Sequence, residues 1–117
     1  MTTITILHNP RCSKSRQTLA LLEENGVKPD VVEYLKTPLA KHELQDLFKK
    51  LNLETVRDMM RIKEAEYKEA NLGDKDVTND MLFEAMVETP KLIERPVVIN
   101  GNKAKIGRPP EAVLDII

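Results

Sequence analysis

The sequence predicts an α/β fold built on a small mixed sheet, and three observations support that prediction. Two strand-forming segments near the N-terminus flank a helix-forming segment, a helical block fills the middle of the chain, and alternating apolar residues return after residue 95. With 117 residues, of which 41% are hydrophobic and 32% charged, the chain can bury one core. We expect one domain over residues 1–117, with a helical insertion at about residues 38–90.

The N-terminal part of the chain predicts a strand, a helix and a second strand. Residues 4–7 are apolar and β-branched, and Asn9-Pro10 is typical of a turn. Residues 13–16 lead into residues 18–24, which have helix-forming composition, and the helix is expected to end near Asn25-Gly26, a pair that favours a helix C-terminus. Residues 31–35 then predict a second strand. This order indicates a βαβ unit, in which the two strands are parallel.

The middle of the chain predicts only helices. Shorter helices are expected at residues 54–60 and 64–70, and Thr78 or Asn79 can cap a further helix that ends before residue 89. The clearest signal is an amphipathic helix with apolar residues at i, i+3, i+4 and i+7, namely Leu44, Leu47, Phe48 and Leu51. These helices offer packing surfaces and few chemically active side chains.

The C-terminal part predicts a hairpin and a last helix. Residues 95–99 form a strand that begins at a proline, residues 100–103 form the turn, and residues 104–106 form the return strand. The last helix begins within residues 107–110, with proline in its first turn. The complete order is β-α-β, a helical block and β-β-α, with a cysteine in the loop after the first strand. This is the thioredoxin-like arrangement, in which the position of Arg95-Pro96 usually has a cis peptide bond.

Cys12, the single cysteine, lies in the loop between the first strand and the first helix. At a helix N-terminus the free backbone N–H groups and the helix dipole favour negative charge, so they lower the pKa of a thiol and can bind an oxyanion beside it. Ser13 and Lys14 lie in this first turn, and Arg11 and Arg16 add positive charge nearby. We therefore expect Cys12 to be a nucleophile directed at an oxyanion. The alternative is an inert residue that closes the loop.

Composition argues against several classes of function. A single cysteine excludes an internal disulfide, so a redox cycle must take its second thiol from another molecule, and no Cys/His cluster has metal-ligand spacing. The net charge of −1 provides no general field for nucleic acid or anionic lipid. The sequence has no apolar run of membrane-spanning length and no signal-peptide pattern. We expect no metal, no nucleic-acid or membrane partner, and a cytoplasmic location.

Four motifs together resemble the glutaredoxin-coupled arsenate reductase family, along the whole chain and in the same order. They are His8-Asn9-Pro10-Arg11-Cys12-Ser13-Lys14-Ser15-Arg16, Met60-Arg61-Ile62-Lys63-Glu64, Ile93-Glu94-Arg95-Pro96-Val97-Val98 and Ile106-Gly107-Arg108-Pro109. The resemblance implies an oxidoreductase whose cysteine attacks arsenate to form a thiol–arsenate adduct. Glutathione then enters as co-substrate, and glutaredoxin resolves the mixed species as arsenite is released. It implies no bound cofactor.

The resemblance also implies roles for individual residues. Cys12 matches the nucleophile, His8 matches a residue near the thiol that assists its ionisation, and Ser15 matches a residue that can hydrogen-bond the sulfur. Ser13 and Lys14 belong to the oxyanion-binding loop. Three arginines match the group that holds the oxyanion: Arg61, Arg95 and Arg108. Arginine suits this role because it stays charged and offers a planar fork of donors.

Taken alone, these residues allow other interpretations. Arg61 lies in a charged stretch where surface positions are common, and Arg95 could pair with a carboxylate. Arg108 could be an ordinary loop residue, and His8 could satisfy a backbone carbonyl.

Two other functions stay open: a redox-responsive adaptor that binds RNA polymerase, and a general glutathione-dependent thiol oxidoreductase. Such adaptors typically carry a Cys-x-x-Cys pair, and the second position of that pair is occupied here by Ser15.

Overall fold

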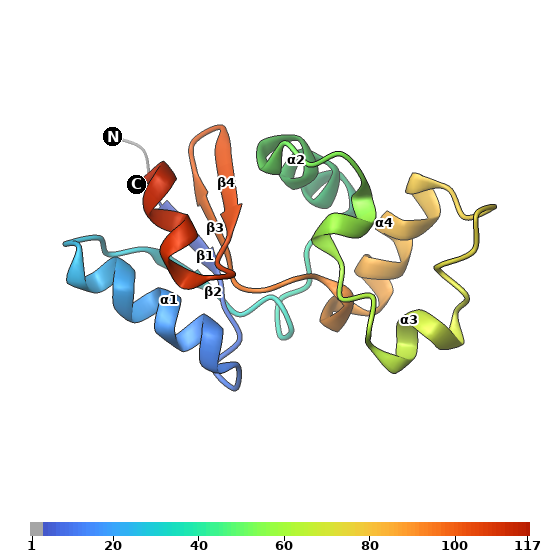
Figure 1. The fold of residues 1–117 in the computed structure, drawn as a ribbon, viewed down its shortest axis with the longest axis horizontal. Helices are drawn as coiled ribbons and strands as arrows, with labels where there is room; N and C mark the ends of the chain where they lie inside the picture. The colour runs from blue at the N-terminus through green and yellow to red at the C-terminus, as the bar shows by residue number, and fades with distance from the viewer. Residues whose placement is uncertain (1–3) are drawn as a thin grey trace. The chain divides into compact units, whose positions relative to one another are not determined.

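The computed structural model describes residues 4–117, which divide into two compact units. The first unit consists of the described part of Met1–Thr37 together with Arg95–Ile117, and the second unit is Pro38–Glu94. The first unit joins N-terminal and C-terminal parts of the chain, so the blue and the orange strands of Figure 1 lie in one sheet. The sites predicted at Cys12, Arg95 and Arg108 all fall in this unit.

The first unit contains a four-stranded mixed sheet in the order β2-β1-β3-β4. The central strand β1 (Ile4–Leu7) pairs in parallel with β2 (Asp30–Val32) and antiparallel with β3 (Val97–Asn100). Strand β4 (Lys103–Ile106) completes the β3–β4 hairpin (Figure 1), whose turn includes Gly101 at a φ of +62°. This arrangement confirms the predicted α/β, thioredoxin-like class.

The core of the first unit lies between the sheet and two helical segments, α1 (Ser13–Glu24) and the 3₁₀ helix η3 (Pro110–Ile116). Ile6 and Val98, which are register partners on β1 and β3, pack against Leu22 of α1 and Val113 of η3, and all four are fully buried. Burial of one such side chain stabilises the fold by about 1.5–3 kcal/mol. The packing of α1 on β1 fixes the loop between them, which carries Cys12.

The second unit is helical. It contains α2 (Lys41–Leu51), the 3₁₀ helix η1 (Val56–Met59), α3 (Ala65–Glu69), α4 (Asn79–Glu88) and the 3₁₀ helix η2 (Pro90–Leu92). The predicted amphipathic helix is confirmed, because Leu44, Leu47 and Leu51 are buried. Thr78 caps α4, as predicted for this position, and its hydroxyl oxygen accepts the N–H of Met81 at 3.2 Å.

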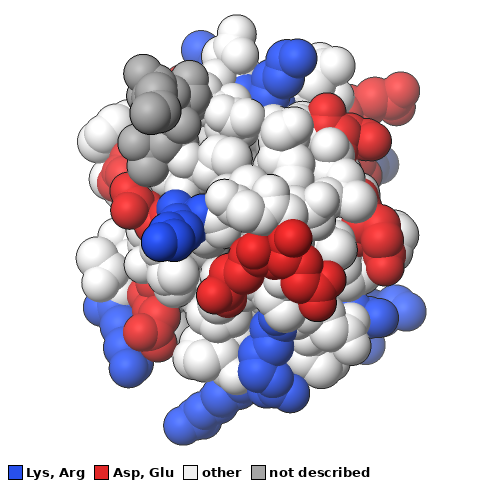
Figure 2. Space-filling view, turned by 90° about the vertical axis from the view of Figure 1, so that its left-hand side faces the viewer, with Lys and Arg blue, Asp and Glu red and all other residues white. Residues whose placement is uncertain are grey.

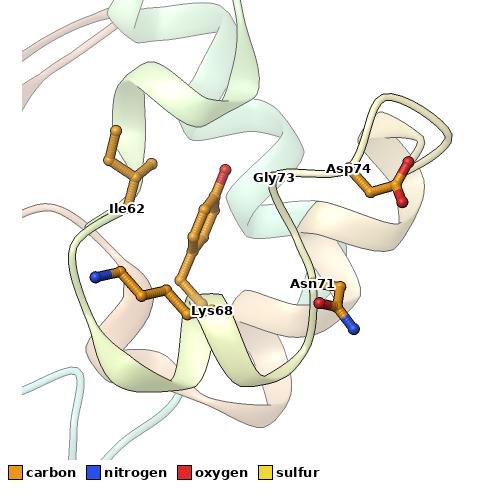
Figure 3. Close-up of a pocket in the computed structure, with 6 residues that line it drawn as sticks. Ile62, Lys68, Asn71, Gly73 and Asp74 are labelled. Atoms are coloured by element: carbon orange, nitrogen blue, oxygen red, sulfur yellow. The ribbon is translucent and has the colours of Figure 1, made fainter.

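A pocket of about 430 Å³ lies in the second unit, beside α3. Figure 3 shows Ile62 and Lys68 on one side of it and Gly73 and Asp74 on the other. The Arg57 side chain fixes the segment that follows α3, because its Nη2 donates to the carbonyl of Leu72 at 2.8 Å. The lining of this pocket includes none of the side chains that the sequence assigns to a site.

The structure corrects three expectations about local structure. The second strand covers Asp30–Val32 rather than 31–35, because the N–H groups of Lys36 and Thr37 both donate to the carbonyl of Glu33 and turn the chain. The helix expected at 54–60 is reduced to the single turn η1, since Met60 is extended and forms a bridge with Ile93. The last helix is a 3₁₀ rather than an α-helix.

Charged side chains of both signs are interspersed on the face of the molecule seen in Figure 2. Along residues 4–117, the longest helix, α1, has 12 residues, fewer than the roughly 20 that a bilayer span requires. None of the helices described is long and apolar enough to cross a membrane.

Candidate functional site

Cys12 is the N-cap residue of α1, which agrees with its predicted position at or next to the start of the first helix. Its backbone is extended, with φ −91° and ψ 122°, and its carbonyl accepts the first helical hydrogen bond, from the N–H of Arg16 at 3.0 Å. The Cys12 side chain makes no regular capping hydrogen bond at this end of α1. The N–H groups of the first turn are therefore directed toward the half-buried Cys12 thiol and toward any anion bound beside it.

The loop that carries Cys12 is held by its own hydrogen bonds. The N–H of Cys12 donates to the carbonyl of Asn9 at 3.0 Å, and the N–H of Arg11 donates to the Asn9 side-chain oxygen at 3.0 Å. The Arg16 guanidinium donates to the carbonyl of Pro10 at 2.8 Å. These short-range contacts fix the loop without a ligand, so the position of the sulfur is built into the fold.

The pKa of the Cys12 thiol lies below its ordinary value. Burial raises this pKa, but its effect is outweighed by the N–H of Ser15, the charge of Arg95, the N–H of Lys14 and the charge of Arg108. The helix N-terminus and two arginines thus act in the same direction, toward the thiolate. Because the thiolate is the nucleophilic form of cysteine, this environment indicates a reactive residue and not an inert one.

Arg95 and Arg108 reach the thiol from two neighbouring segments of the first unit. Arg108 Nη2 lies 4.0 Å from the Cys12 sulfur, and its Nε donates to the carbonyl of Arg95 at 2.9 Å. Arg95 immediately precedes the cis peptide bond to Pro96, and its Nε and Nη1 atoms are buried. The sulfur and two guanidinium groups therefore form one cluster that can hold an anion beside the thiol.

Gly107 allows the Arg108 segment to approach α1. A Cβ atom at this position would lie 2.7 Å from Thr18 Oγ1 and 2.8 Å from Pro96 Cγ, closer than real Cβ contacts. The N–H of Gly107 also donates to the carbonyl of Pro96 at 2.9 Å, so the backbone cannot move away freely. Glycine is required here by close packing rather than by its backbone angles.

We expect Gly107→Ala to lower the free energy of unfolding by about 1–3 kcal/mol, because the added methyl overpacks this contact. Gly73→Ala is the matched control, since a Cβ there meets Tyr67 at an ordinary 3.5 Å and should change stability by less than about 0.5 kcal/mol. Urea unfolding of both variants measures the difference. Equal stabilities would show that the Gly107 contact relaxes without cost.

His8 and Ser15 form a buried polar pair beneath the Cys12 loop. The Ser15 hydroxyl oxygen accepts the N–H of Asn9 at 3.0 Å and lies 2.7 Å from His8 Nδ1. Burial lowers the pKa of His8, Glu33 raises it, Arg16 lowers it, and the net direction is downward. We assign a neutral ring whose Nδ1 accepts the Ser15 hydroxyl hydrogen and whose proton is on Nε2. The Ser15 hydroxyl thus hydrogen-bonds to His8, while the Ser15 backbone N–H faces the Cys12 sulfur.

We expect Ser15→Ala to raise the pKa of His8, because it removes the donor that favours the neutral ring. The free energy of unfolding should fall by about 1–3 kcal/mol, since buried polar groups lose their partner. Titration of the His8 ring by NMR, together with urea unfolding, measures both effects. Ser13→Ala is the matched control, because Ser13 is exposed in the same turn. A His8 pKa that is unchanged would contradict the assigned tautomer.

The remaining predicted residues are placed as follows. Ser13 and Lys14 are exposed in the first turn of α1, and the backbone N–H of Lys14 lowers the pKa of the Cys12 thiol. Arg61 belongs to the second unit, where it forms an ion pair with Glu64 at 2.5 Å. Its N–H donates to the carbonyl of Leu92 at 2.7 Å. Across the described residues, no three His, Cys, Asp or Glu side chains group as metal ligands.

Sequence reasoning missed Glu33, whose negative charge raises the pKa of His8 from the end of the neighbouring strand. A signal for it was present. Leu7 of β1 is the register partner of Val32 of β2, so the residues that follow, His8 and Glu33, leave the same edge of the sheet. Side chains that follow parallel strands gather at this edge, which is where α/β proteins bind their ligands.

Comparison with known proteins gives matches along almost the whole chain. The ArsC family model matches residues 7–116. An arsenate reductase of Haemophilus influenzae is 54% identical over 114 residues, which cover 97% of this chain and 98% of that protein. An Escherichia coli protein described as uncharacterized is 55% identical over 114 residues, which cover 97% of this chain and 96% of that protein. The structure of an arsenate reductase from Vibrio cholerae matches with a TM-score of 0.98 at 54% identity, covering 99% of this chain and 98% of that one.

Proposed function

This chain belongs to the ArsC family, and on that premise we propose that it reduces arsenate to arsenite with Cys12 as the nucleophile and glutathione and glutaredoxin as the source of electrons. The observation that carries the proposal is the cluster formed by the Cys12 sulfur, the N-terminus of α1 and the charges of Arg95 and Arg108. A thiolate and an arsenate anion repel each other. Two guanidinium groups offset that repulsion and stabilise charge that develops on oxygen.

The proposed reaction balances in two steps. The Cys12 thiolate attacks arsenic, an As–O bond breaks, and the oxygen leaves as water after protonation, with arsenic still As(V). A second thiolate then attacks the Cys12 sulfur, so that an S–S bond forms and the S–As bond breaks. The electron pair of the broken bond stays on arsenic, which leaves as arsenite, As(III). Oxidation of two thiols to a disulfide supplies the two electrons.

The second thiol has to come from outside the chain, because Cys12 is its single cysteine. Glutathione and glutaredoxin meet this requirement: the first supplies the thiol that forms the mixed disulfide, and the second exchanges with that disulfide and restores the Cys12 thiolate. Both belong to the reducing thiol pool of the cytoplasm, which is where we place the reaction.

Steady-state arsenite production from arsenate tests this proposal. We expect turnover when glutathione and glutaredoxin are both present and a large loss when glutaredoxin is omitted, since the mixed disulfide then accumulates. Equal rates with and without glutaredoxin would overturn the coupling while leaving arsenate reduction intact. Absence of arsenite under every thiol condition would overturn the reaction itself.

A further inference from the structure

A cleft of about 250 Å³ lies directly beside the Cys12 loop, within the first unit. It opens where β1 and β2 end, the edge at which α/β proteins bind ligands. One wall is the loop before Cys12 and the other is the turn after β2. The lining residues are His8, Asn9, Pro10, Arg11, Glu33, Leu35 and Lys36.

The lining of this cleft combines both charges with an apolar surface. Lys36 Nζ lies 3.5 Å from Glu33 Oε1, so an anion and a cation stand side by side at the rim. Arg11 is an exposed second cation, and Leu35 is 44% exposed although it is a large apolar residue. A ligand that matches this pattern carries an ammonium next to a carboxylate, a second carboxylate and an apolar backbone between them. A small zwitterionic peptide has these features.

The cleft is also connected to the nucleophile by the chain itself. Arg11, which lines it, directly precedes Cys12, and the N–H of Cys12 donates to the carbonyl of Asn9, another lining residue. A peptide that occupies the cleft therefore lies against the loop that carries the Cys12 thiol. When the peptide is bound in this way, the reaction between its thiol and Cys12 becomes effectively unimolecular.

We propose that this cleft is the subsite for glutathione, an inference that rests on the proposed function. Glu33 faces the α-ammonium of the γ-glutamyl group, Lys36 faces its α-carboxylate, and Arg11 faces the glycine carboxylate, while Leu35 packs against the peptide. The bound thiol loses its proton to solvent and attacks the sulfur of the Cys12–arsenate adduct. The S–S bond then forms, and the S–As electron pair stays on the departing arsenite.

The kinetic test compares two thiols in a single turnover. At saturating arsenate, the rate of mixed-disulfide formation at Cys12 is followed as a function of thiol concentration, with glutathione and with 2-mercaptoethanol. Lys36→Glu is expected to raise the half-saturating glutathione concentration by about three- to tenfold, because a modest exposed attraction becomes a repulsion. The 2-mercaptoethanol curve should not change, since this thiol lacks the charged groups. Lys28→Glu, which makes the same charge change at an exposed position outside the cleft, is the matched control.

Binding of S-methylglutathione, which cannot react, tests the subsite without any chemistry. Backbone amide shifts are expected at His8, Asn9 and Arg11 and at residues 33–36 in the wild type and in Lys28→Glu, with weaker binding in Lys36→Glu. Shifts confined to other residues, or equal affinities in all three proteins, would overturn the subsite. So would an equal loss with both thiols in the kinetic test. If the wild type makes no arsenite but S-methylglutathione binds in the cleft, the proposed reaction fails and the subsite stands.

Discussion

Replacing Cys12 by serine is expected to reduce arsenite formation by at least about 10⁴-fold, the scale on which loss of a covalent nucleophile acts. A serine hydroxyl has a far higher pKa than a thiol, so the N-terminus of α1 and the two arginines cannot ionise it at neutral pH. The chain has no other cysteine to take over. Arsenite production by the wild type and Cys12→Ser, at equal protein concentration, measures the effect.

The fold of Cys12→Ser should be unchanged, because the residue is half-buried and the contacts of the loop are made by its backbone. Equal melting temperatures of the two proteins would show that the loss is chemical. A Cys12→Ser variant with turnover within tenfold of the wild type would contradict the role of Cys12 as nucleophile.

Replacing Arg95 or Arg108 by alanine is expected to lower kcat/KM for arsenate by about 10²–10³-fold, the usual effect of removing one group that stabilises developing charge on oxygen. Arg108→Lys should recover only part of this loss, since lysine keeps the charge but not the planar fork. The kinetic constants for arsenate measure these effects. Lys105→Ala is the matched control, because this exposed residue of β4 is not among the charges that act on the thiol.

The same arginine variants should shift the pH dependence of thiol alkylation upward. Both positive charges lower the pKa of Cys12, so removing either one raises it, and the midpoint of the reaction with iodoacetamide moves to higher pH. Iodoacetamide is neutral and needs no oxyanion site. Its rate well above the midpoint should therefore change little, while arsenate turnover stays low. Equal losses with both reagents would show that these arginines act only on the thiol.

The local part of the site follows from the sequence, because it depends on neighbours in the chain. The strand at residues 4–7, a helix that follows the Cys12 loop and ends near Asn25, and the position of Cys12 at or next to the N-terminus of that helix are confirmed. Strand-forming residues, an Asn-Pro turn and helix-forming residues each act over a few positions, so their order alone places the thiol against free N–H groups.

The rest depends on contacts between distant segments, which the sequence does not specify. Ser15 hydrogen-bonds His8 because the α1 turn packs over the end of β1. Arg108 reaches the Cys12 sulfur because Gly107 fits against Thr18. The second strand was predicted too long for a related reason: its apolar residues continue to Leu35, but the backbone turns at Glu33. The apolar pattern alone does not show where a strand ends and a turn begins.

The most direct test of the central claim is a single turnover with equal concentrations of protein and arsenate and an excess of glutathione, without glutaredoxin. Quenched samples are analysed for arsenite and, by mass spectrometry, for the disulfide between Cys12 and glutathione. We predict that the two products appear at the same rate and in a one-to-one ratio, because the bond that releases arsenite is broken as the disulfide forms. Arsenite without the Cys12 disulfide, or the disulfide in the absence of arsenate at the same rate, would contradict attack of Cys12 on arsenate.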